Sequence, residues 1–321
     1  MADDITTVTI PVLLLGCGGV GRELLHHIVA SRHLHSKRGL VLRVVGICDS
    51  RSLLLVEDVA AMGFDDAFLT EICRIKSSSS SLSALLDFGH CQLFKDSEAS
   101  TKILDIAGLL GRTTGLTVVD CTASTETVGI LKETVDLGCC TVLANKKPLT
   151  CGTDDYDKLI SNFRRIRFES TVGAGLPVIV SVTRVLASGD PIYRIIGSLS
   201  GTLGYVMSEV EDGKSFSKAL ILARLLGWRI NMDDIQVESL YSNEHGPNSM
   251  STEDFLRIGL PSLDRDVQER VSAASSRGKV LRYVCVIEGS RCQVGLQELP
   301  KDSPLGRLRG SDNVVMVVLH V

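Results

Sequence analysis

Short apolar runs alternate with amphipathic segments over the first 150 residues. The runs expected to form strands cover residues 7–15, 41–47, 116–121 and 141–144. A period close to 3.6 residues predicts helices over residues 22–30, 64–75, 100–110 and 125–137. Strands that are apolar along most of their length are typical of a parallel sheet covered on both faces. The alternation therefore predicts an α/β domain with a doubly wound sheet over residues 1–150.

A different pattern follows Pro148. The strands expected there cover residues 166–169, 193–200, 235–241, 278–288 and the apolar tail 314–321. The expected helices cover residues 154–164, 177–186, 201–210, 218–226 and 252–275. Because strands and helices no longer alternate regularly, residues 151–321 are expected to form an α+β domain with a mixed or antiparallel sheet.

A glycine-rich turn, GCGGVG, separates the first strand from the first helix. In such a turn the first glycine permits the tight bend, the second lets a pyrophosphate approach the backbone, and the third lets the helix pack closely. The N–H groups at the helix start then hold the phosphates. An ordinary tight turn is the alternative, but the strand before and the helix after favour a Rossmann-type dinucleotide site. Its expected residues are Gly16, Gly18, Gly19, Val20 and Gly21.

An acidic residue stands at the end of the second expected strand. A carboxylate at that position, here Asp49, can accept hydrogen bonds from the adenosine ribose and so favours NAD. Arg51 follows two residues later and is able to pair with the 2′-phosphate of NADP instead. Both cofactors therefore remain open.

Composition narrows the function classes further. The net charge of −4 gives no indication of binding to nucleic acid or to an anionic membrane. No apolar run of about 18 residues predicts a transmembrane helix. The acidic start, MADDITT, is unlike a secretory leader, so a cytoplasmic location is expected. Ten cysteines without a C-x-x-C pair predict reduced, mostly buried thiols.

Three segments carry a family resemblance: LANKKP (143–148), FESTVGAGLP (168–177) and SGTLGYV (200–206). Together with the glycine turn, in this order and spacing, they resemble homoserine dehydrogenase, in its monofunctional, plant- or yeast-like form. The resemblance implies reversible reduction of L-aspartate 4-semialdehyde to L-homoserine with NAD or NADP (EC 1.1.1.3). This step belongs to threonine, methionine and isoleucine biosynthesis. It also implies a homodimer formed through the second domain, which binds the small-molecule substrate.

The resemblance assigns roles to several residues. Lys146 matches the strand-end lysine that stabilises negative charge beside the cofactor. Lys218 matches the catalytic acid/base lysine. Thr122 and Ser124 resemble residues that line the nicotinamide side, although small hydroxyls there are equally able to cap a helix.

A second glycine-rich loop matches the monovalent cation site of the family. The carboxylate of Glu169 and the carbonyls of Val172, Ala174 and Leu176 suit a hard cation such as sodium. A glycine turn that caps the following helix is the alternative.

Two departures from the family pattern stand out. The acidic loop that holds the substrate amino group is missing before Lys218, which indicates an internal deletion. The sequence also ends at Val321, before the last helix of the family, which indicates a truncated C-terminus. A catalytically impaired nucleotide-binding variant, acting through a dimer with a complete copy, is therefore the alternative function.

Overall fold

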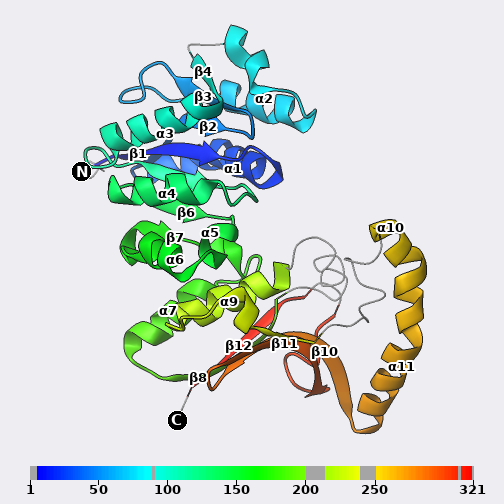
Figure 1. Cartoon of the computed structure of the whole chain (residues 1–321). Coiled ribbons are helices and arrows are strands. Elements are labelled where there is room, and N and C mark those ends of the chain that lie inside the picture. The colour runs from blue at the N-terminus through cyan, green and yellow to red at the C-terminus, as the bar shows by residue number, and fades with distance from the viewer. Residues whose placement is uncertain (1–5, 89–90, 200–213, 239–250, 310–311, 320–321) are drawn as a thin grey trace. The chain divides into compact units, whose positions relative to one another are not determined.

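The structure is a computed structural model that describes residues 6–88, 91–199, 214–238, 251–309 and 312–319. It divides into two compact units, Met1–Phe168 and Glu169–Val321, which are described separately (Figure 1). The boundary expected at residue 150 lies inside the first unit. The first unit extends further because β7 (Ile166–Arg167) pairs with its sheet.

The first unit is built on a seven-stranded sheet in the order β4-β3-β2-β1-β5-β6-β7. The remaining strands are β1 (Val8–Leu15), β2 (Leu40–Cys48), β3 (Ser52–Val56), β4 (Cys91–Lys95), β5 (Thr117–Asp120) and β6 (Cys140–Leu143). The neighbouring pairs β2–β1, β1–β5, β5–β6 and β6–β7 are parallel. The pairs β2–β3 and β3–β4 are antiparallel. The expected α/β fold with a doubly wound sheet is confirmed.

β1 lies in the middle of this sheet because its residues are apolar on both faces. Leu13 and Leu14 are fully buried, and Leu15 is 2% exposed. Fully burying a leucine side chain contributes about 1.5–3 kcal/mol relative to leaving it exposed. The C-terminal end of β1, where the glycine turn begins, is thereby held at the centre of the sheet.

Six helices of the first unit are described: α1 (Gly19–Lys37), α2 (Asp66–Ser77), α3 (Asp96–Leu110), α4 (Thr127–Asp136), α5 (Lys147–Thr150) and α6 (Thr153–Ile160). α1 packs against α2, and α4 packs against α3 and α6, as expected for a doubly wound sheet with a helix layer on each face (Figure 1). The residue before α2, Asp65, accepts a hydrogen bond from Phe68 N at 2.7 Å and caps that helix. Short 3-10 turns lie at Leu82–Phe88 and Phe163–Arg165.

The second unit contains a five-stranded sheet in the order β12-β8-β10-β11-β9. Its strands are β8 (Ile192–Ser198), β9 (Gln236–Val237), β10 (Lys279–Glu288), β11 (Arg291–Pro300) and β12 (Val314–Leu319). All pairings are antiparallel except that of β9 with β11, so the expected mixed sheet is confirmed. Its core contains Ile196, Val284, Val286 and Leu305.

The helices of the second unit are α7 (Val178–Ser188), α9 (Lys214–Leu225), α10 (Thr252–Asp254) and α11 (Leu260–Ser276), with a 3-10 turn at Met232–Asp234. The single helix expected over residues 252–275 is interrupted by a π-helical turn at Phe255–Gly259. Pro261 follows directly, and proline in a helix interior removes a hydrogen bond and clashes with the preceding turn. The helix expected at 201–210 lies outside the described residues.

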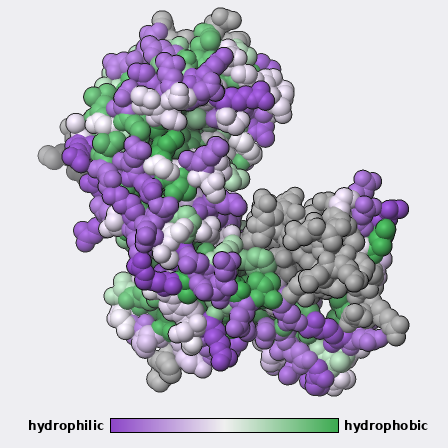
Figure 2. Space-filling model, in the orientation of Figure 1, coloured by the Kyte–Doolittle hydropathy of each residue, from purple (hydrophilic) through white to green (hydrophobic). Residues whose placement is uncertain are grey.

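On the face drawn in Figure 2, hydrophilic residues predominate over the first unit. Within the described ranges no helix is long and apolar enough to cross a membrane.

Candidate functional site

The glycine turn closes at the ends of two neighbouring strands. Gly16 has a φ of +90°, a left-handed conformation that favours glycine. Its N–H donates to Cys48 O at 2.8 Å, which ties the end of β1 to the end of β2. A Cβ at Gly16 would lie 2.8 Å from the backbone nitrogen of Thr122. The turn therefore touches the loop that follows β5.

The start of α1 has the features of a phosphate cradle. A Cβ added at Gly21 would lie 2.0 Å from Gly16 O, so only glycine lets the helix approach the turn. A Cβ at Gly18 or Gly19 would meet nothing within 4 Å, so these two positions border open space. α1 begins at Gly19 and has no side-chain cap, so its first N–H groups keep their capacity for an anion. The residues present fit a dinucleotide pyrophosphate.

Cys17 lies inside this turn but is a buried thiol. Its side chain is 3% exposed, and burial raises the pKa of Cys17 to about 12. The thiol therefore remains protonated near neutral pH, and Cys17 is one of the buried free thiols that the sequence predicts.

A buried carboxylate organises the loop after β5. Asp120 is 0% exposed, and its Oδ1 accepts hydrogen bonds from Thr122 N at 2.8 Å and Thr122 Oγ1 at 2.7 Å. Its Oδ2 accepts from Thr127 Oγ1 at 2.7 Å and from Asn145 Nδ2 at 3.0 Å. Each oxygen thus has two donors, as a buried charge requires.

Asn145 connects that loop to the one that carries Lys146. It is 2% exposed, and its amide nitrogen also donates to Ser124 O at 2.8 Å. Its Oδ1 accepts from Lys147 N at 3.0 Å. Lys146 is half-buried and stands between Asn145 and Lys147 in the sequence, directly before α5. Asp120 and Asn145 therefore tie the loop of Thr122 and Ser124 to the loop that carries Lys146, beside the glycine turn.

The sequence left two roles open for Thr122 and Ser124, which are lining the nicotinamide side and capping a helix. Thr122 donates to Asp120, and its Oγ1 accepts from Ser124 N at 3.3 Å. Ser124 Oγ accepts from Glu126 N at 3.1 Å, close to the start of α4. This contact lies before α4, whose N-cap residue Glu126 has no side-chain cap hydrogen bond. Both the nicotinamide-side role and the capping role therefore stay predictions.

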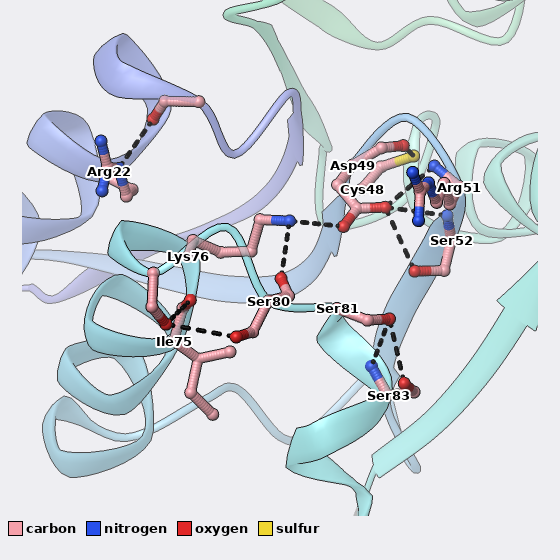
Figure 3. Close-up of polar contacts among 12 residues, drawn as sticks. Arg22, Cys48, Asp49, Arg51, Ser52, Ile75, Lys76, Ser80, Ser81 and Ser83 are labelled. Carbon is pink, nitrogen blue, oxygen red and sulfur yellow. Dashed lines mark hydrogen bonds and ion pairs between the residues drawn. The ribbon is translucent and has the colours of Figure 1, made fainter.

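Asp49 occupies the turn between β2 and β3. Oδ1 of Asp49 accepts from Arg51 N at 2.9 Å and from Ser52 N at 2.9 Å, and Oδ2 accepts from Lys76 Nζ at 2.8 Å (Figure 3). Burial raises the pKa of Asp49, but the hydrogen bonds from Lys76, Arg51 and Ser52 lower it more, and the net pKa lies below its ordinary value. The sequence pattern did not single out Lys76.

In the second unit, Lys218 lies on α9 and is half-buried. Its Nζ donates to Leu199 O, the last described residue before the segment 200–206. The run from Ala219 to Ala223 is at most 1% exposed and fixes the helix in the unit. The segment 200–206 itself lies outside the described residues.

The second glycine-rich loop caps a helix. Oε1 of Glu169 accepts from Ile179 N at 3.0 Å and Oε2 accepts from Val180 N at 2.9 Å, at the start of α7. Gly173 and Ala174 have φ values of +85° and +56° and form the turn. Leu176 O, an expected cation ligand, accepts from Val178 N at 2.8 Å. The capping alternative is thus present, and the cation remains a prediction. In the described parts of the chain no cluster of three metal-binding side chains occurs.

A sequence model described as homoserine dehydrogenase matches residues 177–220 and 215–320. This match, together with the relatives named next, supports the homoserine dehydrogenase family for this chain. The match falls into two segments that overlap at residues 215–220, next to the place where the sequence analysis expects an internal deletion. The internal deletion itself stays a prediction.

Two bifunctional proteins align along almost all of this chain. The bifunctional aspartokinase/homoserine dehydrogenase of Haemophilus influenzae is 27% identical over 337 residues, covering 95% of this chain and 38% of that protein. Bifunctional aspartokinase/homoserine dehydrogenase 1 of Zea mays is 29% identical, covering 97% and 35%. The chain therefore spans little more than a third of the length of these relatives.

Solved structures confirm the fold. A protein of unknown function from Candida auris has a TM-score of 0.75 at 22% identity, covering 97% of this chain and 89% of that one. A hyperthermophilic archaeal homoserine dehydrogenase in complex with NADPH has a TM-score of 0.65 at 20% identity, covering 97% and 88%. Both likenesses extend over both units, so the Rossmann-type domain and the mixed-sheet domain occur together in other chains.

Proposed function

We propose that this chain catalyses the reversible NAD(P)-dependent reduction of L-aspartate 4-semialdehyde to L-homoserine. The observation that carries the proposal is the buried network of Asp120 and Asn145. It holds Lys146 in the loop beside a glycine turn that fits a pyrophosphate. The family match and the relatives named as homoserine dehydrogenases support this reaction over other hydride transfers.

Each lysine has a distinct proposed part. A bound nicotinamide cofactor supplies or accepts the hydride. The ammonium group of Lys146 stabilises negative charge that develops on the carbonyl oxygen. Lys218, in the second unit, is the proposed acid/base, which gives a proton during reduction and takes one back during oxidation. Because the strand-end loops are fixed by buried hydrogen bonds, Lys146 is positioned before the substrate arrives.

The second glycine-rich loop has a proposed structural role as a monovalent cation site. The two oxygens of Glu169 each accept one N–H and retain a further lone pair. These lone pairs, with the carbonyls of Val172, Ala174 and Leu176, are the proposed oxygen-only ligand set, which suits sodium. The cation would stabilise the loop and take no part in the hydride transfer.

The chain is further proposed to act as a homodimer through its second unit. Sedimentation or light scattering of the purified protein measures this directly, and a monomer at micromolar concentration would contradict it. A cytoplasmic location also stays a prediction, which cell fractionation tests.

The activity is tested by mixing the purified chain with L-homoserine and either NAD⁺ or NADP⁺ and recording the absorbance of reduced cofactor. Turnover that needs homoserine is the expected result. Lys146→Ala should lower kcat at least about tenfold, whereas Lys132→Ala, which removes a half-buried lysine paired with Asp155, should leave it unchanged. Turnover unaffected by Lys146→Ala would remove this residue from the mechanism.

One observation favours a second candidate function. The two segments of the family match overlap at residues 215–220, next to the expected internal deletion of the substrate-holding acidic loop. A chain that binds the cofactor but has lost turnover is therefore the alternative. Cofactor binding with no detectable homoserine oxidation would support this alternative and contradict the first proposal.

A further inference from the structure

A run of five serines, residues 77–81, joins the end of α2 to the 3-10 turn Leu82–Phe88. All five serines are exposed, and so is Ser83 inside the turn. The hydroxyl of Ser81 accepts from Ser83 Oγ at 2.9 Å, so these two side chains bond to each other at the surface (Figure 3). The run therefore presents several hydroxyls to solvent that the proposed reaction does not use.

Ser77 connects this run to the helix that follows the glycine turn. It is the last residue of α2, and its Oγ accepts from Arg22 Nη1 at 2.7 Å. The same hydroxyl donates to Cys73 O at 2.7 Å. Arg22 lies in the first turn of α1, which begins at Gly19. The hydroxyl of Ser77 is thus one hydrogen bond away from the helix start that fits a pyrophosphate.

A second contact connects the run to the turn after β2. Lys76, the residue before Ser77, pairs through its Nζ with Asp49 Oδ2 at 2.8 Å. The same ammonium donates to Ser80 O at 3.1 Å (Figure 3). In a Rossmann-type domain the adenosine ribose binds at the end of this strand. The serine run is therefore attached to two parts of the candidate dinucleotide site.

The residues before Ser77 are those that an arginine-directed protein kinase selects. Such kinases recognise an arginine three residues before the acceptor, since their acidic groups pair with its guanidinium. Arg74 stands at that distance from Ser77 and from no other serine of the run. Its side chain is 69% exposed, and its exposed ion pair with Glu71 contributes little to stability, so a kinase can replace that pair. Ser77 also stands at a helix end, where the backbone frays.

A phosphate on Ser77 changes the charge beside the candidate dinucleotide site. It carries about −1.5 to −2 charges at neutral pH and forms strong hydrogen bonds with arginine, so it would hold Arg22. It would also stand at the C-terminal end of α2, where the helix dipole is negative, and would weaken the last turn of that helix. Because a dinucleotide carries negative charge itself, both effects oppose its binding.

We propose that Ser77 is a phosphorylation site for an arginine-directed protein kinase and that its phosphate weakens dinucleotide binding. Ser77 Oγ bonds to the γ-phosphorus of ATP, the bond from that phosphorus to the β,γ-bridging oxygen breaks, and ADP leaves. The hydroxyl proton passes to the catalytic aspartate of the kinase and then to solvent. This inference rests on the proposed dinucleotide function and adds control of cofactor binding to it.

The modification is tested on the full chain with ATP, Mg²⁺ and calmodulin-dependent protein kinase II, activated by Ca²⁺ and calmodulin, as the arginine-directed probe. Mass spectrometry should find phosphate on Ser77, and Arg74→Gln should lower its rate of incorporation at least about tenfold. Ser170 also follows an arginine by three residues and is measured separately in the same spectra. No phosphate on Ser77, or an unchanged rate in Arg74→Gln, would overturn the inference.

The effect on binding is tested with Ser77→phosphoserine, made by genetic encoding. Its affinities for NADPH and NADH, measured by calorimetry, should be at least about fivefold lower than those of the unmodified chain. Ser36→phosphoserine is the matched control, because Ser36 is exposed and also lies in the last turn of a helix. It is about 25 Å along α1 from the glycine turn, where the charge is screened, so affinity should stay within about twofold.

Two further variants separate charge from structure. Ser77→Ala loses the bond from Arg22 without gaining charge and should bind both dinucleotides within about twofold of the wild type. Ser77→Asp carries one negative charge, should lower both affinities, and tests the proposal even if the phosphorylated chain does not fold.

The outcomes are distinct. Unchanged affinity in Ser77→phosphoserine would overturn the inference, as would an equal loss of affinity in Ser36→phosphoserine or in Ser77→Ala. Loss confined to the variants that carry negative charge at position 77 would support it. An unmodified chain that binds neither NADPH nor NADH would instead contradict the proposed dinucleotide function, while the kinase reaction would still decide whether Ser77 is modified.

Discussion

At the scale of single residues, Asp120 and Asn145 connect sequence to function most directly. Both are buried polar residues at strand ends, and their hydrogen bonds fix the loops that carry Thr122 and Lys146. The acid at the end of LTVVDC and the asparagine of LANKKP were visible in the sequence. Their pairing was not predictable, because it depends on β5 and β6 being neighbours in the sheet.

Asn145→Ala tests this network. The substitution leaves Asp120 Oδ2 with one donor fewer and Lys147 N without its acceptor, so stability should fall by about 1–3 kcal/mol. Turnover should fall at least about tenfold because Lys146 is no longer held in position. Urea unfolding and steady-state rates measure the two effects. Asn162→Ala, at an exposed asparagine without a side-chain cap bond, is the matched control and should change neither.

Asp49 gives a prediction for acid stability. Because the pKa of Asp49 is lower in the folded state than in the unfolded chain, the charged carboxylate stabilises the fold above the ordinary aspartate value of about 3.9. That contribution disappears as the pH falls through the lowered folded value. Asp49→Asn should therefore reduce the unfolding free energy at neutral pH by about 1.5–3 kcal/mol and flatten its acid dependence.

Urea unfolding from neutral pH down to about pH 3 measures this effect. Asp105→Asn, at an exposed ion pair, is the control and should follow the wild-type curve. An acid limb of equal steepness in Asp49→Asn and the wild type would show that the pair with Lys76 contributes nothing.

At the scale of elements, apolar continuity was the reliable signal. It predicted β1, β5 and β10 to within about two residues of their observed bounds. It missed β3, β4 and β11. β3 and β4 pair with each other in antiparallel order although they lie far apart in the sequence, and β11 pairs with β10. β11 had a local signal, because Gly289 and Ser290 both have positive φ and form a two-residue hairpin turn.

The contact of α1 with the glycine turn gives the next prediction. Gly21→Ala places a Cβ 2.0 Å from Gly16 O, so the helix must move away and the pyrophosphate site is distorted. Cofactor affinity, measured by calorimetry, should fall by at least about 100-fold. Gly129→Ala lies in α4, where an added Cβ meets nothing within 4 Å. This control should instead stabilise the protein by about 0.5–1 kcal/mol and leave cofactor affinity unchanged.

The start of α7 provides a test of the cap and of the cation together. Glu169→Ala removes the acceptors of two backbone N–H groups and should lower stability by about 0.5–2 kcal/mol. If the loop holds sodium, added sodium chloride should raise the melting temperature of the wild type more than that of Glu169→Ala. Glu133→Ala, at an exposed position of α4, should behave like the wild type. An identical response of all three proteins to sodium would leave only the capping role.

At the scale of the whole molecule, two units with different architectures were predictable from the change of pattern after Pro148. The division after Phe168 was not, because α6 and β7 follow that proline and still belong to the first unit. The family resemblance was readable from three short segments, since glycine- and lysine-containing loops at strand ends carry the chemistry.

The measurement that tests the central claim most directly compares the wild-type chain with Lys218→Ala in L-homoserine oxidation, with NADPH affinity recorded in parallel. We predict homoserine-dependent formation of reduced cofactor by the wild type. We predict loss of at least about 100-fold in kcat for Lys218→Ala, with NADPH affinity within about twofold. A wild-type chain that binds NADPH but never oxidises homoserine, or a variant with undiminished kcat, would contradict the account.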